Sequence, residues 1–281
     1  MRHILFPVDF SAPCENLVPA VVAWAQRYEA DLTLLHVHEL PVVAIEQPNV
    51  AAELEFLREA AQQRLDAFLP AGFGGLPVRR VQVDGRAGSA IVEYAAANGM
   101  DLIMMPTHGY TRFRQMLLGS VVASVLHDSE VPVWTSAHAD TALAAPAPKH
   151  VLCAIDCGPQ TRHVLEAAVA VAKRFGAPLR IVYSHPALDT RFPSATAERA
   201  HRLVHEEALA AYQAVAAELD LPEYLEVLEE PTLVAGVLGA IATHQADLLV
   251  IGRGRIQGVM GRLRTNAHDL IRMSPCPVLS V

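Results

Sequence analysis

The sequence has few of the residues that mark disulfide frameworks, metal centres or membrane spans. Its four cysteines form no CxxC pair and follow no repeated metal-type spacing; they are Cys14, Cys153, Cys157 and Cys276. We therefore expect reduced, buried or half-buried thiols. No apolar run approaches the roughly twenty residues of a membrane helix. Residues 1–9 fall far short of a secretory leader, so we expect a cytoplasmic protein with no membrane segment.

Positive charge and aromatic residues are also scarce. The 22 Lys and Arg residues are outnumbered by 30 Asp and Glu residues, which gives a formal net charge of −8. No basic run is present, and binding to nucleic acid or to an acidic membrane surface would require one. Aromatic residues make up 6% of a chain that is 52% hydrophobic, so the core must consist mainly of Ala, Val, Leu and Ile. This composition is typical of α/β proteins with buried parallel strands.

Several catalytic and metal-binding signatures are missing. The chain has no GxxxxGK[ST], HExxH or GxSxG motif, and Ser120 has no partner His and Asp in a recognisable order. We therefore expect no catalytic residues. His36 with His38, and His201 with His205, are possible metal pairs, but neither has a third ligand at a suitable spacing. Solvated or capping histidines are the alternative, and we predict no metal site.

The hydrophobic pattern of the first half predicts a parallel sheet. Its five short apolar segments alternate with helical patterns, and each connection is long enough for a right-handed crossover. The near-continuous apolar character of residues 32–37 suits an interior strand, whereas residues 78–83 alternate as a strand nearer the edge does. The expected strands are residues 4–8, 32–37, 78–83, 102–105 and 132–134.

The same pattern returns in the second half of the chain. Residues 151–156 repeat residues 4–9, and residues 179–184 repeat residues 32–37, both at an offset of 147. Residues 138–148 are rich in Ala and Pro and have no apolar period, which is typical of a linker. The sequence therefore predicts two tandem doubly wound, Rossmann-like α/β domains, at residues 1–137 and 149–281, each a five-stranded parallel sheet with helices on both faces.

The connection from Pro106 to Val121 is the candidate ligand site. Gly109 stands at the exit of the fourth predicted strand, and Gly119 and Ser120 open the next predicted helix. Glycine lets a ligand approach the backbone, and we expect Ser120 to be the N-cap of a helix whose first amides are unpaired. Such a terminus favours an anion. A surface loop with an ordinary helix cap is the alternative.

These segments together resemble the universal stress protein family. The resemblance rests on the Pro-Val-Asp-Phe-Ser start, the Leu-Leu-His-Val strand, the Thr-His-Gly loop, the Leu-Leu-Gly-Ser turn and the Pro-Val final strand, and it spans both halves. ATP-binding members carry G-x-x-G-x9-G-[S/T]. This chain has Gly109, nine further residues and then Gly119 and Ser120, but Pro106 stands in place of the first glycine. Because proline has no N–H, any backbone donation there is lost.

The resemblance implies an adenine-nucleotide site in domain 1. Its ligand would be ATP, with or without Mg²⁺; ADP or another adenylate is an alternative. Asp9 would hold ribose hydroxyls or Mg²⁺, or it would simply cap its loop. The residues that the resemblance assigns to the site are Pro7, Val8, Asp9, Val37, Thr107, His108, Gly109, Arg112, Gly119, Ser120 and Val121.

The second copy departs from this pattern. Arg255 stands at the position of Gly109, and Arg264 and Thr265 stand at those of Gly119 and Ser120. The arginines would pair with acidic neighbours or reach a phosphate through their side chains. Ala154 and Asp156 repeat the end of the first strand, whereas Ser184 replaces Val37. We therefore expect one nucleotide site per chain, in domain 1.

Three functions remain open from the sequence. The first is an ATP-binding stress-response regulator or adaptor that acts on an unknown protein partner. The second is an interaction module that binds no nucleotide, and the third is a slow ATPase. The resemblance also implies pairing of the final strands, residues 131–135 and 276–281, and hence a homodimer.

Overall fold

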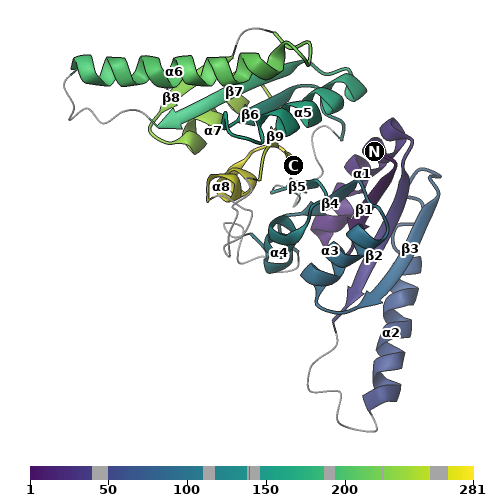
Figure 1. The fold of residues 1–281 in the computed structure, drawn as a ribbon. Helices are drawn as coiled ribbons and strands as arrows, with labels where there is room; N and C mark the ends of the chain where they lie inside the picture. The colour runs from purple at the N-terminus through teal and green to yellow at the C-terminus, as the bar shows by residue number, and fades with distance from the viewer. Residues whose placement is uncertain are drawn as a thin grey trace. The chain divides into compact units, whose positions relative to one another are not determined.

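The chain forms two compact units, unit 1 (Met1–Ala147) and unit 2 (Pro148–Val281). The structure, a computed structural model, describes residues 1–39, 50–109, 118–137, 139, 146–186, 194–222, 225–253 and 265–281. Each unit is a parallel sheet with helices packed against it (Figure 1). The predicted fold class, two tandem Rossmann-like α/β domains, is confirmed.

Unit 1 has the strand order β3-β2-β1-β4-β5, with all strands parallel. The chain builds β1, β2 and β3 toward one edge and then returns to add β4 and β5 on the other side of β1. The strand order therefore reverses between β1 and β4, which is where α/β sheets commonly hold ligands. The elements are β1 (His3–Pro7), α1 (Ala12–Tyr28), β2 (Asp31–His38), α2 (Val50–Asp66), β3 (Val78–Asp84), α3 (Ala87–Ala97), β4 (Leu102–Pro106), α4 (Ser120–Asp128) and β5 (Val133–Ser136).

The core of unit 1 follows from the apolar pattern. Strand β4 is buried along its whole length, as an interior parallel strand must be. Trp24 of α1 meets Trp134 of β5 edge to face, with ring centroids 6.4 Å apart, and both are almost fully buried. Helices α3 and α4 also approach closely, because a Cβ on Gly88 would lie 2.5 Å from Ser124 Oγ.

Unit 2 repeats this architecture with the strand order β10-β9-β6-β7-β8. In both units an aspartate just before the fourth strand binds the backbone at the start of the first strand. Asp101 accepts hydrogen bonds from the backbone N–H groups of Arg2 and His3, and Asp247 accepts them from those of Lys149 and His150. The elements are β6 (Val151–Ile155), α5 (Thr161–Phe175), β7 (Leu179–Pro186), α6 (Ser194–Ala216), β8 (Glu226–Glu230), α7 (Leu233–Thr243), β9 (Leu248–Ile251), α8 (Thr265–Met273) and β10 (Val278–Ser280).

Two pairs of corresponding helices have equal lengths in the two units. Helices α3 and α7 each have 11 residues, and α4 and α8 each have nine. Aligning their first residues relates α3 to α7 by 146 positions and α4 to α8 by 145, so position-by-position comparison of the two units is possible. Within the described part of the chain, no helix is both long and apolar enough to cross a membrane.

Candidate functional site

A cavity of about 290 Å³ opens where the strand order of unit 1 reverses. The carboxyl ends of β1, β2 and β4 form its floor, and the first turns of α3 and α4 form its sides. Its described lining consists of Pro7, Val8, Asp9, Cys14, Leu35, His36, Val37, Ala87, Ile91, Met105, Pro106, His108, Gly109, Gly119, Ser120, Val121 and Val122. The volume is near the lower end of the range for small-molecule sites, roughly 300 to 1,000 Å³.

Asp9, directly after β1, is the carboxylate of the cavity. Its Oδ1 accepts hydrogen bonds from the backbone N–H of Ser11 at 2.9 Å and from Ser11 Oγ at 2.5 Å. Its Oδ2 lies so close to Gly109 that a Cβ there would be 2.1 Å away. Only a glycine therefore permits this orientation of Asp9, and the strand exit and the loop after β4 meet at the carboxylate.

Phe10, which follows Asp9, has a left-handed backbone with φ of 61°. This conformation is strained for a bulky residue, and such strain persists only where neighbours enforce it. The Phe10 ring packs on His36 with centroids 4.5 Å apart, and the Arg64 guanidinium carbon lies 4.5 Å from its centroid. The residue that corresponds to Phe10 in unit 2, Cys157, has φ of 52°, so both units turn the chain in the same way after the aspartate.

His36 joins β2 to β1 at the floor of the cavity. Its Nδ1 lies 2.8 Å from the backbone oxygen of Val8, so Nδ1–H donates to that carbonyl. Burial lowers the pKa of His36 below its ordinary value of 6.5, although the hydrogen bond to Val8 opposes this change. Cys14, also in the lining, has its pKa raised by burial and by the charge of Asp9, so its thiol stays protonated and unreactive.

The amino end of α4 provides the candidate anion site. Gly119, not Ser120, is the N-cap, and no side chain caps the helix there, so the prediction for Ser120 was wrong by one residue. The first helical hydrogen bond runs from Ala123 N–H to the Gly119 oxygen at 2.9 Å. The N–H groups of residues 120, 121 and 122 precede that bond and lie at the cavity wall. Free amides and the helix dipole favour an anion at this position.

Thr107 and His108 support this end of the cavity from β4. The Thr107 carbonyl accepts the Gly119 N–H at 2.9 Å, and Thr107 Oγ1 lies 3.2 Å from His108 Nδ1. Thr107 is 4% exposed and lies beneath the lining, whereas His108 forms part of it. Thr107 therefore contacts Gly119 and His108 from beneath the lining, and its contact with a phosphate stays a prediction.

Pro106 removes one donor on the cavity side of β4. The N–H groups of Ile103 and Thr107 donate to the carbonyls of Pro132 and Ser136, on the β5 side. Because N–H groups alternate along a strand, the nitrogen of residue 106 faces β1 and the cavity. The sheet tolerates the proline at this strand end, and the lost donor is one that a ligand would meet.

Nine of the eleven predicted site residues lie together in the cavity lining: all except Thr107, which lies beneath it, and Arg112, which is outside the described residues. Sequence reasoning missed one side of the cavity. Ala87 and Ile91 lie four positions apart on the first turns of α3, and the helix that follows an edge strand could have been recognised as a wall. The other lining residues outside the predicted set are Cys14, Leu35, His36, Met105, Pro106 and Val122.

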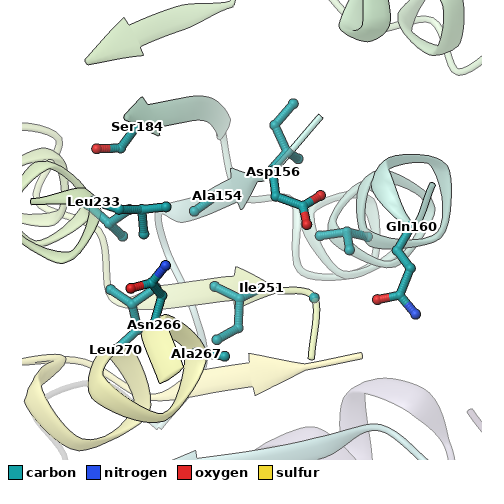
Figure 2. A pocket seen from close by; sticks show the side chains of 13 residues that line it. Ala154, Asp156, Gln160, Ser184, Leu233, Ile251, Asn266, Ala267 and Leu270 are labelled. Atoms are coloured by element: carbon teal, nitrogen blue, oxygen red, sulfur yellow. The ribbon is translucent and has the colours of Figure 1, made fainter. Parts of the chain in front are cut away.

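Unit 2 has a cavity at the corresponding place, but it is much smaller, at about 80 Å³. Figure 2 shows Asp156 and Gln160 at one side and Ser184, Leu233 and Asn266 at the other. The Asp156 Oδ1 accepts the Gly158 N–H at 2.9 Å, so this carboxylate also caps its own loop. Arg255 and Arg264, which stand at the positions of Gly109 and Gly119, lie outside the described residues.

The possible metal pairs do not develop into a metal centre in the described part of the chain. No group of three His, Cys, Asp or Glu side chains there is arranged to hold an ion. His38 Nδ1 lies 3.5 Å from Asp84 Oδ1, and the side chain of His201 is outside the described residues. All four cysteines are free.

These features define a class: tandem doubly wound α/β units whose first copy has an open cavity at the point where strand order reverses. A model of the universal stress protein family matches residues 1–136 and again residues 148–281. The chain therefore belongs to the universal stress protein family, in its tandem form, and the resemblance seen in the sequence is confirmed.

Individual relatives agree with this assignment. The universal stress protein Slr1230 of Synechocystis is 30% identical over 138 residues, which cover 48% of this chain and 42% of Slr1230. The universal stress protein MJ0577 of Methanocaldococcus jannaschii is 29% identical over 149 residues, which cover 47% of this chain and 92% of MJ0577. The crystal structure of a universal stress protein from Archaeoglobus fulgidus has the same fold, with a TM-score of 0.70 at 21% identity and coverage of 99% of this chain and 95% of that one.

Proposed function

We propose that unit 1 binds ATP and that the chain is a nucleotide-dependent regulator. The observation that carries the proposal is the uncapped amino end of α4 beside an open cavity at the point of strand reversal. The family's ATP-binding members carry a glycine pattern of which this chain keeps Gly109, the nine-residue spacing, Gly119 and Ser120. Both glycines are closely packed: a Cβ on Gly119 would lie 3.1 Å from the Thr107 oxygen.

The residues present fit such a ligand. The amides of residues 120–122 would hold phosphate oxygens, and the Asp9 carboxylate would accept ribose hydroxyls or coordinate a nucleotide-bound Mg²⁺. Val37, Ala87 and Ile91 give the opposite part of the cavity an apolar surface suited to a base. Mg²⁺ would neutralise part of the triphosphate charge.

Regulation would arise because ATP contacts two helices and the loop between β4 and α4 at once. A ligand that favours one arrangement of these elements shifts the population toward it, and a partner that reads the surface then responds. In this proposal ATP changes the association of the chain with itself or with another protein. Sedimentation velocity with and without ATP measures the first effect directly.

The first test asks whether nucleotide binds. We expect the purified protein to release ATP or ADP near one per chain on denaturation, or, if it is isolated empty, to give heat on calorimetric titration with ATP and Mg²⁺. Absence of both up to millimolar ATP would exclude the proposal. Multiple turnovers of ATP per minute would instead support an enzyme.

A matched pair of variants tests where the phosphates bind. Val121 and Asn266 are both the second residue of their helix, α4 or α8, and each lines the cavity of its unit. Val121→Asp places a carboxylate at the amino end of α4, where it suits the helix dipole but repels phosphate. We expect ATP binding to weaken by at least about tenfold in Val121→Asp, with folding retained, and to be unchanged in Asn266→Asp.

Pro106 supports one alternative, an interaction module that binds no nucleotide. Its nitrogen faces the cavity but carries no hydrogen, so it cannot donate a hydrogen bond to a ligand. Pro106→Gly restores both the donor and the family's first glycine. If the wild type fails to bind ATP but Pro106→Gly binds it, the alternative is correct.

A further inference from the structure

The cavity of unit 2 is smaller than that of unit 1, although most of the side chains that line both cavities are no larger in unit 2. Ten pairs of corresponding positions line both cavities, and at five of them the residue of unit 2 is the smaller one. These five would enlarge the cavity of unit 2, yet it has about 80 Å³ against about 290 Å³. The five pairs, with unit 1 first, are Pro7 and Ala154, Val37 and Ser184, Ile91 and Val237, Pro106 and Gly252, and Val122 and Ala267.

Among the ten described pairs, one accounts for most of the opposite change. Ala87 begins α3 and Leu233 begins α7, and each lines the cavity of its unit. Leucine carries an isobutyl group where alanine has a methyl group. The other pairs in which unit 2 is larger, Val8 with Ile155 and Val121 with Asn266, differ by a single heavy atom. Figure 2 shows Leu233 on α7, on the side of the cavity that faces Ala154.

A hydrogen bond to the first turn of each helix holds the backbone at this position beside the cavity. In α7, Thr232 is the N-cap, and its Oγ1 accepts the Ala235 N–H at 3.1 Å. In α3 the N–H of Ala87 donates to Glu39 Oε1 at 2.8 Å. A capped first turn holds its backbone in place, and the residue at its start is therefore presented to the cavity.

We infer that the first residue of the helix after the edge strand, Ala87 in unit 1 and Leu233 in unit 2, decides whether each cavity admits an adenine nucleoside. Leu233 occupies the space of the base and sugar, so unit 2 binds no nucleotide and the chain binds one. This inference rests on the proposed function of unit 1. It assigns closure of the second site to a side chain of α7.

Reciprocal substitutions test the inference. Ala87→Leu should raise the Kd for ATP by at least about tenfold, because an isobutyl group overfills the site, and Ala87→Val should fall between it and the wild type. Leu233→Ala should leave ATP binding in unit 1 unchanged and add a second site for adenosine, which needs no phosphate contacts. The double variant should bind adenosine in unit 2 alone. Calorimetry gives the affinities and stoichiometries, and thermal unfolding shows that each variant is folded.

The outcomes separate this inference from the proposed function. If the wild type binds ATP but folded Ala87→Leu binds it equally well, or Leu233→Ala gains no adenosine site, the inference is wrong and the proposed function stands. If the wild type does not bind ATP, the proposed function fails. The inference is then decided by whether Leu233→Ala binds adenosine: binding supports it, and no binding contradicts it. The graded Ala, Val, Leu series at position 87 keeps the test decisive should the leucine variant fold poorly.

Discussion

At the scale of single residues, the site depends on contacts that only small side chains allow. Asp9 Oδ2 occupies the space that a Cβ on Gly109 would need, and Ser11 holds the other carboxylate oxygen. The resemblance identified Asp9 and Gly109 separately. Their mutual contact is a long-range feature, because it joins the ends of two strands far apart in the sequence.

Gly109→Ala should therefore weaken ATP binding through Asp9. The added methyl forces the exposed Asp9 side chain to rotate away from Ser11, and we expect the Kd for ATP to rise about tenfold, while the free energy of unfolding changes by less than about 1 kcal/mol. Calorimetric titration and urea unfolding measure the two effects. Gly239→Ala is the control, since a Cβ there meets no atom within 4 Å. Unchanged ATP affinity in Gly109→Ala would show that Asp9 plays no part.

His36 should make stability depend on pH. Its pKa is lowered in the folded state, chiefly by burial, from an ordinary value of 6.5. As the pH falls below 6.5, His36 takes up a proton more readily in the unfolded chain than in the folded one. Protonation therefore favours unfolding, and the folded state is most stable above this pH. We expect the free energy of unfolding in urea to fall between about pH 8 and about pH 5.5, and to fall less in His36→Gln. Equal falls in both proteins would rule out His36 as the source.

Individual site residues could be predicted only where the chemistry is local. Asp9, Gly109 and Gly119 follow strand ends or begin a helix, and such positions are visible in a sequence. Thr107 looked equally suitable, but its burial under Gly119 depends on the pairing of β4 with β5. Ala87 and Ile91 were missed because nothing in the order of the chain shows that α3 reaches the ends of β1 and β4.

At the scale of elements, the helices that meet the cavities begin in different ways. Helix α4 begins at a glycine with no side-chain cap, α3 receives the Glu39 carboxylate, and α7 caps itself with Thr232. A cap stabilises a helix and also occupies the amides that an anion would bind. Of these three helices, α4 is the one whose first turn receives no side-chain hydrogen bond among the described residues.

Removing the caps should separate stability from binding. Thr232→Ala should lower the free energy of unfolding by about 1 kcal/mol, and Glu39→Ala by roughly 0.3 to 1 kcal/mol because its contact is at the surface. Neither change touches the amides of α4, so ATP affinity should stay within a factor of about two. Urea unfolding and calorimetry measure both quantities. A large loss of ATP binding in Thr232→Ala would place the nucleotide in unit 2 and contradict the account.

The elements themselves were largely predictable, and their starts were not. All five predicted strands of unit 1 are present, because each is a short apolar run between turn residues. Helix α1 begins at Ala12, because Ser11 caps it and Pro13 fits its first turn. For α4, serine is the better cap by propensity, but the Gly119 carbonyl accepts the first helical bond and makes the glycine the N-cap.

At the scale of the whole molecule, duplication lets one unit serve as a control for the other. The repeat offset, the strand order and the turn after each first strand are shared, which is why a sequence with two similar halves predicted two similar folds. The difference between the cavities was only partly predictable. The loss of Gly-Ser in the second copy is visible in the sequence, but the filling of its cavity by Leu233 required the structure.

The location of both tryptophans provides a test of which unit binds. Trp24 and Trp134 are the chain's two tryptophans, and both are buried in unit 1. ATP at a free concentration of about 100 times its Kd should raise the free energy of unfolding, as followed by tryptophan fluorescence, by about 2.7 kcal/mol. At the same ATP concentration, Val121→Asp should reduce this shift to about 1.4 kcal/mol or less, and Asn266→Asp should retain it in full. A calorimetric transition that ATP raises while the tryptophan signal stays unchanged would assign the nucleotide to unit 2.

The most direct measurement of the central claim is a crystal structure of the chain grown with ATP and Mg²⁺. The account predicts triphosphate density at the amino end of α4, against the backbone of residues 119–122, and no nucleotide beside Leu233 in unit 2. An empty cavity in unit 1, or a nucleotide only in unit 2, would contradict it.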